Sequence, residues 1–499
     1  MKIVIVGGGT AGWITAAFLI KYTNFRDITL IESSNIPIIG AGEGSTGSLP
    51  WFINGTDPWP NDVVNELDFL KKVKGTPKIA ITLKNWKGDG TKYYSPLAAS
   101  RTRLNRIDTG FLGTILKYGN GNNASIGAYL LDNKLSPILN RNGRKIKDLI
   151  PYSYHFDGHE AGKYFKDICL KFGVKVIDSE VVDLAFDENA FLSNIKLSNG
   201  QKLNGDLFFD CSGFSRVLIG KTQNKWISFK DNLPTNSAIP FSKEISSKNV
   251  NFETLAETMN SGWMWQIPLQ HRYGCGYVYC DEFQNFDKSV EELEKHLGNK
   301  IEPIKHIKFE AGRFDKTLNK NIIAIGLSSH FLEPLQATSI HIAINTLTLF
   351  VLHFLKTKDS LKSEVNENNF NKLINITIDD YRDLLQMHYL MGRCDTPFWK
   401  FVKNELVITD KNKELFEIAK YRIPNTLDFN PTHGAVGWGL WTHMIDNVGL
   451  FKKELIVEEL KNYNKEAEAE REAYHVFETF NKLKNDIIPA SEYFKYLKI

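Results

Sequence analysis

Residues 1–19 read MKIVIVGGGTAGWITAAFL, and this stretch decides the fold. An apolar run, Ile3 to Val6, breaks into Gly7, Gly9 and Gly12 and then into a pattern typical of a helix. Gly7 permits a tight turn, Gly9 lets backbone N–H groups approach a pyrophosphate, and Gly12 lets the helix pack on the strand. The stretch therefore predicts a dinucleotide-binding cradle, with a purely structural glycine turn as the alternative.

An acidic residue supports the cradle. Glu32 follows the next apolar run, ITLI, about twenty residues beyond the glycines, where a carboxylate binds a ribose hydroxyl. Thr10 and Ala11, between the glycines, are the remaining candidate contacts. Strand, glycine turn, helix and acid together predict a bound dinucleotide.

Composition limits the classes of function. The chain has 499 residues, 42% hydrophobic and 24% charged, enough for a large core and more than one domain. A formal net charge of +3 is near neutral for this length, so nucleic acid is not an expected partner. Five scattered cysteines without metal-ligand spacing predict no metal site and a reduced, cytoplasmic protein. With no signal segment and no apolar run approaching the roughly twenty residues of a membrane span, no membrane is expected.

Two more junctions between a strand and a glycine occur far downstream. Residues 207–209 form an apolar run that leads into Asp210 and Gly213. Residues 322–325 form another, followed by Gly326, a loop and a helix whose first amides can face a pyrophosphate or a small anion. Long insertions separate the three junctions, as a flavin-binding fold with an inserted substrate domain requires. A nicotinamide dehydrogenase would usually keep its sheet contiguous.

Several segments resemble a known family. Residues 261–269, SGWMWQIPL, contain the pattern WxWxIP, which resembles a signature of the flavin-dependent tryptophan halogenase family. Six further segments resemble the same family, in order along nearly the whole chain: GAGEGST at 40–46, YHFDG at 154–158, DCSGF at 210–214, GYVY at 276–279, FLEPLQATSI at 331–340 and DTPFW at 395–399. A tryptophan-rich segment alone is more often core packing, but seven ordered segments favour a divergent member of the family.

The resemblance implies an FAD-dependent halogenase with a separate flavin reductase as its partner. In the family, reduced FAD and oxygen oxidise halide to hypohalous acid, which passes through a tunnel to a lysine beside the aromatic substrate. Beyond the first cradle, the residues implied to bind the cofactor are Gly42, Glu43, Asp210, Gly213, Gly326 and Leu332. Trp263, Trp265 and Pro268 are implied to shield the flavin, and Thr338 and Ser339 to bind halide.

Lys78, in the segment KGTPKIAITLKNW, matches the family's catalytic lysine. An ammonium or amine in an apolar cleft can hydrogen-bond hypohalous acid or form a haloamine, and burial would lower its pKa toward neutrality. The alternative is a solvated surface charge, because Lys71, Lys72, Lys74 and Lys84 are close in the sequence.

Position 336 departs from the family. A glutamate follows EPL in the family, and Gln336 stands there in this chain, as the second candidate catalytic residue. A carboxylate can accept the proton that the substrate ring releases, whereas an amide has no titratable proton. Glu333 either faces elsewhere or substitutes in part, and a third alternative is that Gln336 is an ordinary polar residue of an inactive protein.

A second departure concerns the substrate. Members specific for tryptophan hold the indole with a His-Pro-Phe segment, which corresponds here to Ser95, Pro96 and Leu97. Both stacking groups are lost, so we expect a broader pocket and not free tryptophan. Trp438 is a candidate pocket wall, with buried packing as the alternative. Bromide or iodide is expected to be favoured over chloride, because larger halides lose water and electrons more easily and Ser339 replaces a glycine.

The predicted fold class is α/β: a three-layer, Rossmann-like FAD-binding module with an inserted antiparallel sheet and a helical C-terminal subdomain. Residues 1–345 are expected to form the module, with inserted segments at about 75–155 and 225–310, and residues 346–499 a mainly helical cap over the substrate. The predicted function is halogenation of an electron-rich aromatic compound. The alternatives are a flavin monooxygenase of the same fold, which the bulky WxWxIP indoles disfavour, and an inactive flavin-binding protein. A homo-oligomer is compatible with the sequence.

Overall fold

The structure is a computed structural model that describes residues 1–36, 42–55, 57–97, 107–139, 144–145, 152–245, 251–431 and 436–497. Gly40 and Ala41 of the segment GAGEGST lie outside the described residues, as do residues 433–435 ahead of Trp438. Every other candidate site residue lies within them.

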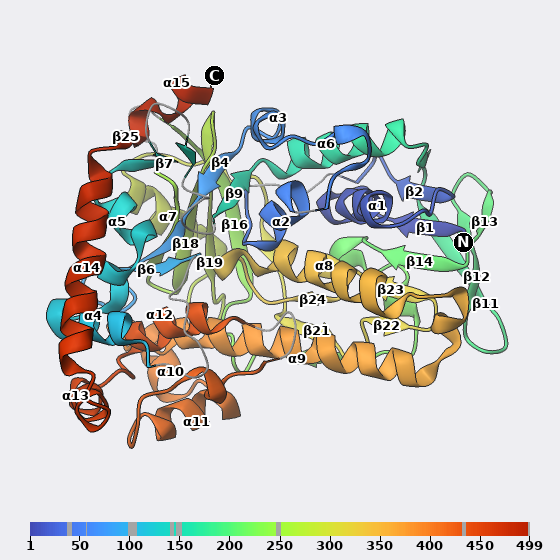
Figure 1. Ribbon diagram of the computed structural model, residues 1–499. Coiled ribbons are helices and arrows are strands. Elements are labelled where there is room, and N and C mark those ends of the chain that lie inside the picture. Colours follow the sequence, from blue (N-terminus) through green and yellow to red (C-terminus); the bar gives the residue numbers. More distant parts are fainter. Residues whose placement is uncertain are drawn as a thin grey trace.

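A six-stranded sheet forms the centre of the part that carries the glycine turns (Figure 1). Its strands lie in the order β10-β2-β1-β14-β23-β22, with the bounds Lys175–Asp178, Ile28–Glu32, Ile3–Val6, Leu207–Asp210, Ile322–Ala324 and Leu318–Asn319. The first five strands are parallel, and β22 pairs antiparallel with β23. The three predicted glycine junctions follow β1, β14 and β23, which are neighbours, so they meet at one edge of the sheet.

Two layers cover this sheet. Helices α1 (Thr10–Tyr22), α6 (Gly158–Lys171) and α8 (Thr338–Leu349) lie on the face that carries Ile3 and Ile5. Val4 and Val6 point to the other face and pack against a three-stranded sheet. Its strands are β11 (Val181–Phe186), β12 (Leu192–Leu197) and β13 (Lys202–Asn204). The alternation along β1 therefore builds two apolar interfaces, and the three layers confirm the predicted α/β class.

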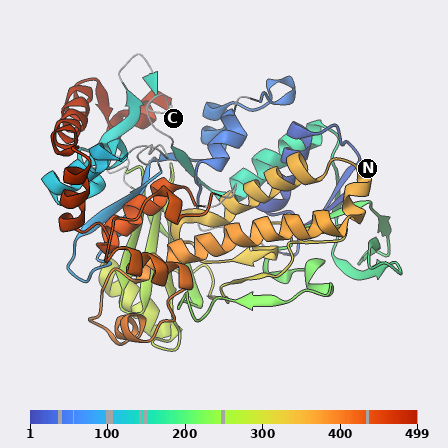
Figure 2. The ribbon, with the colours of Figure 1, turned by 60° about the horizontal axis from the view of Figure 1, so that its bottom comes forward.

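A seven-stranded sheet, built from the inserted segments, stands to one side of the first (Figure 2). Its order is β20-β16-β19-β18-β17-β5-β6, with the bounds Ile307–Lys308, Ser237–Glu244, Arg272–Tyr279, Gly262–Pro268, Glu253–Met259, Ala80–Lys84 and Lys92–Pro96. Its pairs are antiparallel except β17 with β5, which is parallel. The purely antiparallel sheet that we expected is thus mixed, because two separate insertions meet edge to edge at that pair.

Three small sheets join distant parts of the chain. The first contains β3 (Glu43–Gly44), β9 (Ser153–Phe156) and β4 (Thr76–Lys78). The second contains β15 (Trp226–Ser228), β21 (Gly312–Phe314) and β24 (His330–Phe331), and the third β25 (Ile487–Pro489), β7 (Leu135–Leu139) and β8 (Arg144–Lys145). Through β25 the C-terminal segment adds a strand as well as helices, and through β4 the first small sheet holds Lys78.

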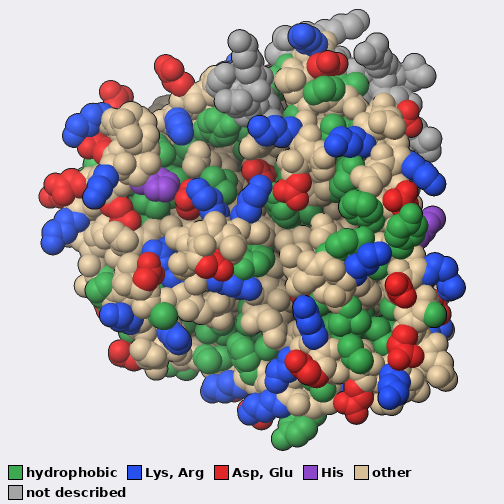
Figure 3. All heavy atoms as spheres, turned by 90° about the vertical axis from the view of Figure 1, so that its left-hand side faces the viewer, with side chains coloured by type: hydrophobic (Ala, Val, Ile, Leu, Met, Phe, Trp, Pro, Cys, Tyr) green, Lys and Arg blue, Asp and Glu red, His purple; other side chains and the backbone are tan. Residues whose placement is uncertain are grey.

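Helices make up most of the chain after α8. They are α9 (Glu364–Tyr389), α10 (Pro397–Asn404), α11 (Asp410–Ile418), α12 (Trp438–Val448), α13 (Lys453–Asn462), α14 (Glu466–Lys484) and α15 (Tyr493–Leu497). Further helices lie earlier: α2 (Ser48–Asn54), α3 (Glu66–Lys72), α4 (Thr109–Tyr118), α5 (Ile126–Asp132) and α7 (Phe286–Leu297). Figure 3 shows the face over α4, α13 and α14, where charged side chains of both signs are interspersed with apolar ones. Buried alanines of α14 pack on α4, as expected of an amphipathic cap.

One described stretch, Leu335–Phe354, is long and apolar enough to cross a membrane by length and composition. The expectation that no apolar run reaches this length was therefore wrong. Of its apolar window, 72% is buried inside the protein, because α8 and the turn after it pack between α1 and α9. The five cysteines are unpaired, and only Cys394 is exposed.

Candidate active site

Close backbone contacts build the glycine cradle after β1. A Cβ on Gly7 would lie 2.3 Å from the carbonyl oxygen of Cys211, and one on Gly12 would lie 1.9 Å from that of Gly7, so both positions need glycine. Gly9 is the N-cap of α1, and no described atom lies within 4 Å of its Cβ position. The space beside Gly9 at the N-terminus of α1 is therefore open, and the cradle fits a pyrophosphate.

Glu32 lies beside the cradle at the end of β2. Its Oε2 is 2.3 Å from the Cβ position of Gly8, and its Oε1 forms an ion pair with Lys166 of α6 at 2.5 Å. The lysine thus holds the carboxylate under the glycine turn. A contact between Glu32 and a ribose stays a prediction.

The other two junctions approach the start of α1. The Oγ1 of Thr10 donates to the carbonyl of Gly158 at 3.1 Å, and the Cβ of Ala11 lies 3.3 Å from the Cβ position of Gly326. Gly213 follows β14 with a positive φ of 66°. The structure therefore places Gly326 of the third junction, and Gly158 at the start of α6, beside the start of α1.

Asp210 shapes the loop after β14. Its carboxylate is fully buried and accepts hydrogen bonds from the backbone N–H groups of Ser212, Leu218 and Ile219 at 3.1, 2.8 and 2.8 Å. The hydroxyl of Ser328 adds another at 3.2 Å. Both oxygens of Asp210 are thus engaged by the chain itself, and a direct contact with a cofactor stays a prediction.

Gly42 and Glu43 lie where the sheet of β3, β9 and β4 meets the seven-stranded sheet. The Cβ position of Gly42 is 3.1 Å from the Cα of Gly274 in β19. Glu43 belongs to β3, and burial together with the nearby Asp157 raises the pKa of its carboxyl to about 7. At neutral pH this carboxyl can therefore hold a proton beside the cradle.

The WxWxIP residues form a packed wall in β18. Trp263 is 1% exposed, and its ring centroid lies 6.3 Å from those of Trp265 and Trp86. The carbonyl of Pro268 accepts a hydrogen bond from the Oγ1 of Thr76 at 2.7 Å. The two indoles are thus packed in the core. A second role for them as a flavin shield stays a prediction.

Lys78 ends β4 in the protein interior, so the surface-charge alternative is wrong. Its side chain is fully buried, and its Nζ has no hydrogen-bond partner among the described residues. Burial lowers the pKa of Lys78 to about 7. Lys71 and Lys72 of α3, by contrast, are exposed. Burial, and the charge of Lys78, also keep the pKa of His155 well below its usual value.

A left-handed turn precedes α8. Gln336 and Ala337 have φ values of 66° and 53°, and α8 begins directly afterwards at Thr338. The Oγ1 of Thr338 is buried without a hydrogen-bond partner among the described residues, and Ser339 is partly buried. Leu332 is buried just before this turn. Two successive non-glycine residues in this conformation are strained, which is typical of functional sites.

Gly44 lies between the lysine and this turn. A Cβ on Gly44 would lie 3.2 Å from the Cβ of Ala337, 3.4 Å from the Nζ of Lys78 and 3.7 Å from the Oγ1 of Thr254. Because Gly44 has no side chain, Lys78 and the turn at Ala337 can lie close together. Gly44 is not among the sequence-based candidates, although the segment GAGEGST contains it.

Gln336 contacts the predicted substrate segment. Its Nε2 lies 3.0 Å from the Oγ of Ser95 and 2.8 Å from the Nε2 of His388. Pro96 is buried at the end of β6, and Leu97 follows it partly buried. No sequence signal pointed to His388, which lies in the last turn of α9.

Glu333 has hydrogen-bond partners other than Gln336. It is fully buried, and its Oε2 accepts hydrogen bonds from the Oγ1 of Thr235 at 2.6 Å and the hydroxyl of Tyr389 at 2.8 Å. Burial raises its pKa to about 7. Among the described residues, no hydrogen bond joins it to Lys78 or Gln336, which favours the alternative that it faces elsewhere.

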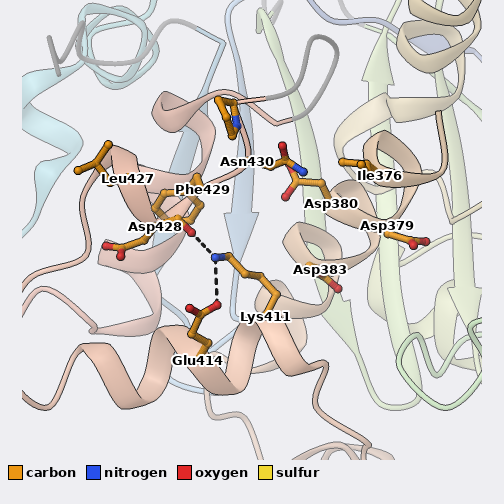
Figure 4. A pocket seen from close by; sticks show the side chains of 11 residues that line it. Ile376, Asp379, Asp380, Asp383, Lys411, Glu414, Leu427, Asp428, Phe429 and Asn430 are labelled. Atoms are coloured by element: carbon orange, nitrogen blue, oxygen red, sulfur yellow. Dashed lines mark hydrogen bonds and ion pairs between the residues drawn. The ribbon is translucent and has the colours of Figure 1, made fainter. Parts of the chain in front are cut away.

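Trp438 packs on Phe429. Phe429 is one of the residues that line a separate cleft of about 470 Å³ between α9, α11 and residues 427–431 (Figure 4). The carboxylates that line this cleft belong to Asp379, Asp380, Asp383, Glu414 and Asp428. Lys411 lies 3.3 Å from Glu414 on the same helix, α11, and the ring centroid of Phe429 is 5.2 Å from that of Trp438. Trp438 thus belongs to an aromatic cluster at an acidic cleft, and its place beside a substrate stays a prediction.

Comparison with known proteins identifies the family of this chain. The sequence model of the family described as tryptophan halogenase matches residues 2–478. The chain belongs to this flavin-dependent halogenase family. It is 31% identical over 451 residues to the tryptophan 7-halogenase RebH of Lentzea aerocolonigenes, covering 84% of this chain and 82% of RebH.

Solved structures of the family have the same fold. A tryptophan 6-halogenase, SttH of Streptomyces toxytricini, matches with a TM-score of 0.86 and 26% identity, covering 99% of each chain. Tar14, a tryptophan C-6 flavin-dependent halogenase (chlorinase) of taromycin biosynthesis, matches with a TM-score of 0.87 and 26% identity over the whole of both chains. The predicted family and fold class are therefore confirmed.

Proposed function

We propose that this chain is a flavin-dependent halogenase that acts on electron-rich aromatic compounds other than free tryptophan, with Lys78 as the residue that delivers the halogen. The observation that carries the proposal is the buried, unpartnered Nζ of Lys78, placed across Gly44 from the turn that begins α8. Family membership supports the flavin and the halide chemistry.

Gly7, Gly9 and Gly12 would hold the pyrophosphate of FAD, and Glu32 its ribose. FAD, when reduced by a separate reductase and bound here, supplies the electrons with which oxygen converts halide into hypohalous acid. Thr338 and Ser339 would bind the halide, because the Oγ1 of Thr338 is buried with no described partner. Trp263 and Trp265 would keep the aromatic substrate away from the flavin.

Lys78 can complete the reaction without a neighbouring carboxylate. With a pKa of about 7, much of it is the neutral amine at neutral pH, which reacts with hypohalous acid to give a haloamine and water. The substrate ring then takes the halogen as a cation, and the proton that it loses returns to the lysine nitrogen. The amine is regenerated, so Gln336 need not accept a proton.

The substrate and halide preferences follow from the two positions at which this chain departs from the family pattern. Gln336 is no base, and Ser95 and Leu97 provide no aromatic clamp, so phenols, anilines and indoles should react best. Bromide or iodide should give more product than chloride.

The test is a mass-spectrometric screen of a phenol, an indole and free tryptophan with reduced FAD, oxygen and each halide. Halide-dependent halogenation of the phenol or indole is expected. Chlorination of free tryptophan as the dominant activity contradicts the substrate assignment. Oxygenated products favour a monooxygenase, and no product with any ring favours an inactive flavin-binding protein.

A further inference from the structure

The amide of Gln336 is held from two sides. Ser95 of β6 lies 3.0 Å from its Nε2, and the Nε2 of His388 lies 2.8 Å from the same atom. Gln336 is 2% exposed, and the other two side chains are fully buried. The amide therefore has two hydrogen-bond partners in a buried environment.

The hydrogen bonds of His388 decide which way the amide points. Its Nδ1 lies 3.0 Å from the carbonyl oxygen of Leu384, which can only accept, so the Nδ1 carries the hydrogen. Burial lowers the pKa of His388 to about 4, so the ring is neutral at neutral pH. The Nε2 is then a lone pair that can only accept, and Gln336 must present its NH₂ group to it.

One atom of the amide is left over. The two hydrogens of the NH₂ group are directed to His388 and to Ser95, whereas the Oε1 of Gln336 receives no hydrogen bond from a described residue. The next residue, Ala337, approaches Lys78 across Gly44. The side-chain carbonyl of Gln336 is thus an acceptor that the described residues leave unused, in the turn whose next residue approaches Lys78.

We propose that His388 is a positioning residue that fixes Gln336 with its carbonyl free for the substrate, so that the site selects aromatic rings that carry an N–H or O–H donor. This inference rests on the proposed halogenase function and narrows its substrate class. If the amide were free to turn over, the site would present a donor as often as an acceptor, and the selection would be lost.

The test compares indole with N-methylindole, which differ in the N–H group, in equilibrium binding to the full chain. His388→Phe keeps a flat ring beside Trp86, whose centroid is 5.8 Å from that of His388, but removes the acceptor. His388→Gln is the matched control, because its side-chain carbonyl can reach the place of the imidazole Nε2. Circular dichroism and thermal unfolding show whether each variant folds.

The unmodified protein should bind indole about 3- to 10-fold more tightly than N-methylindole, the effect of one neutral hydrogen bond. His388→Phe should bring the ratio to within about twofold, and His388→Gln should keep it. Equal affinities in the unmodified protein, no binding of either ring, or an unchanged ratio in His388→Phe overturn the inference.

A spectroscopic measurement covers the case in which His388→Phe does not fold. Nitrogen NMR of the unmodified protein should show His388 as the tautomer with hydrogen on Nδ1, and hydrogen on Nε2 overturns the inference. The proposed function is tested separately. If indole binds selectively but is never halogenated, the halogenase function is refuted and the positioning role of His388 is not.

Discussion

Replacing Lys78 with methionine should stabilise the protein. Burial lowers the pKa of Lys78 from 10.5 to about 7, so below pH 10.5 the unfolded chain binds more protons at this position than the folded chain. One pKa unit corresponds to about 1.4 kcal/mol, and at pH 7 the lysine therefore lowers the free energy of unfolding by about 4 kcal/mol. Methionine has a similar length and no charge, so it removes this cost without leaving a large cavity.

The stability difference between Lys78→Met and the unmodified protein should depend on pH. As the pH rises from 7 to 9, the cost of Lys78 falls from about 4 to about 2 kcal/mol, because each pH unit makes the extra proton on the unfolded chain less favourable by about 1.4 kcal/mol. The stability advantage of Lys78→Met over the unmodified protein should therefore shrink by about half. Urea unfolding at both pH values measures it, with Lys71→Met at an exposed lysine as the control. An advantage that is absent at pH 7, or constant with pH, refutes the depressed pKa.

Three further outcomes are expected. Gly44→Val should lower aromatic halogenation more than about tenfold while hypohalous acid still forms, because its side chain would contact both Ala337 and Lys78; equal losses in both assays would contradict this. The rate of halogenation should rise with pH through about 7 and then level off, since the amine of Lys78 is the reactive form, and a rate that falls above pH 7 would point to the ammonium. Thr338→Val should raise the bromide concentration needed for half-maximal rate several-fold with little change in flavin affinity, measured by bromide titration and flavin fluorescence; an unchanged bromide requirement would remove Thr338 from the halide site.

The sequence predicted the central sheet well. The first strand, Ile3–Val6, matches its predicted bounds, and the runs at 207–209 and 322–325 match β14 and β23 to within one residue. Such fully buried parallel strands are continuous apolar runs that end in glycine, and this pattern is local. The meeting of the three junctions then follows from the topology of parallel sheets.

The arrangement around Lys78 could not be predicted from local patterns. Gly44, Gln336 and His388 come from segments far apart in the chain, and only their packing brings them together. The neighbouring lysines in the sequence favoured a surface position for Lys78, whereas packing with distant segments buries it. Likewise, no local pattern showed that backbone amides of its own loop donate to the carboxylate of Asp210, whose contact with a cofactor stays a prediction.

The central claim is that the amine of Lys78 passes the halogen to the substrate ring. It is tested most directly by comparing Lys78→Met with the unmodified protein in one reaction with bromide, indole, oxygen and enzymatically reduced FAD, with catalase present. Mass spectrometry measures brominated indole, and a β-diketone trap measures hypobromous acid. With the β-diketone in excess, so that it captures hypobromous acid that leaves the protein before indole reacts with it, the unmodified protein should still brominate indole, and Lys78→Met should brominate the trap alone at a similar total rate. Bromination by Lys78→Met at the unmodified rate would contradict the account.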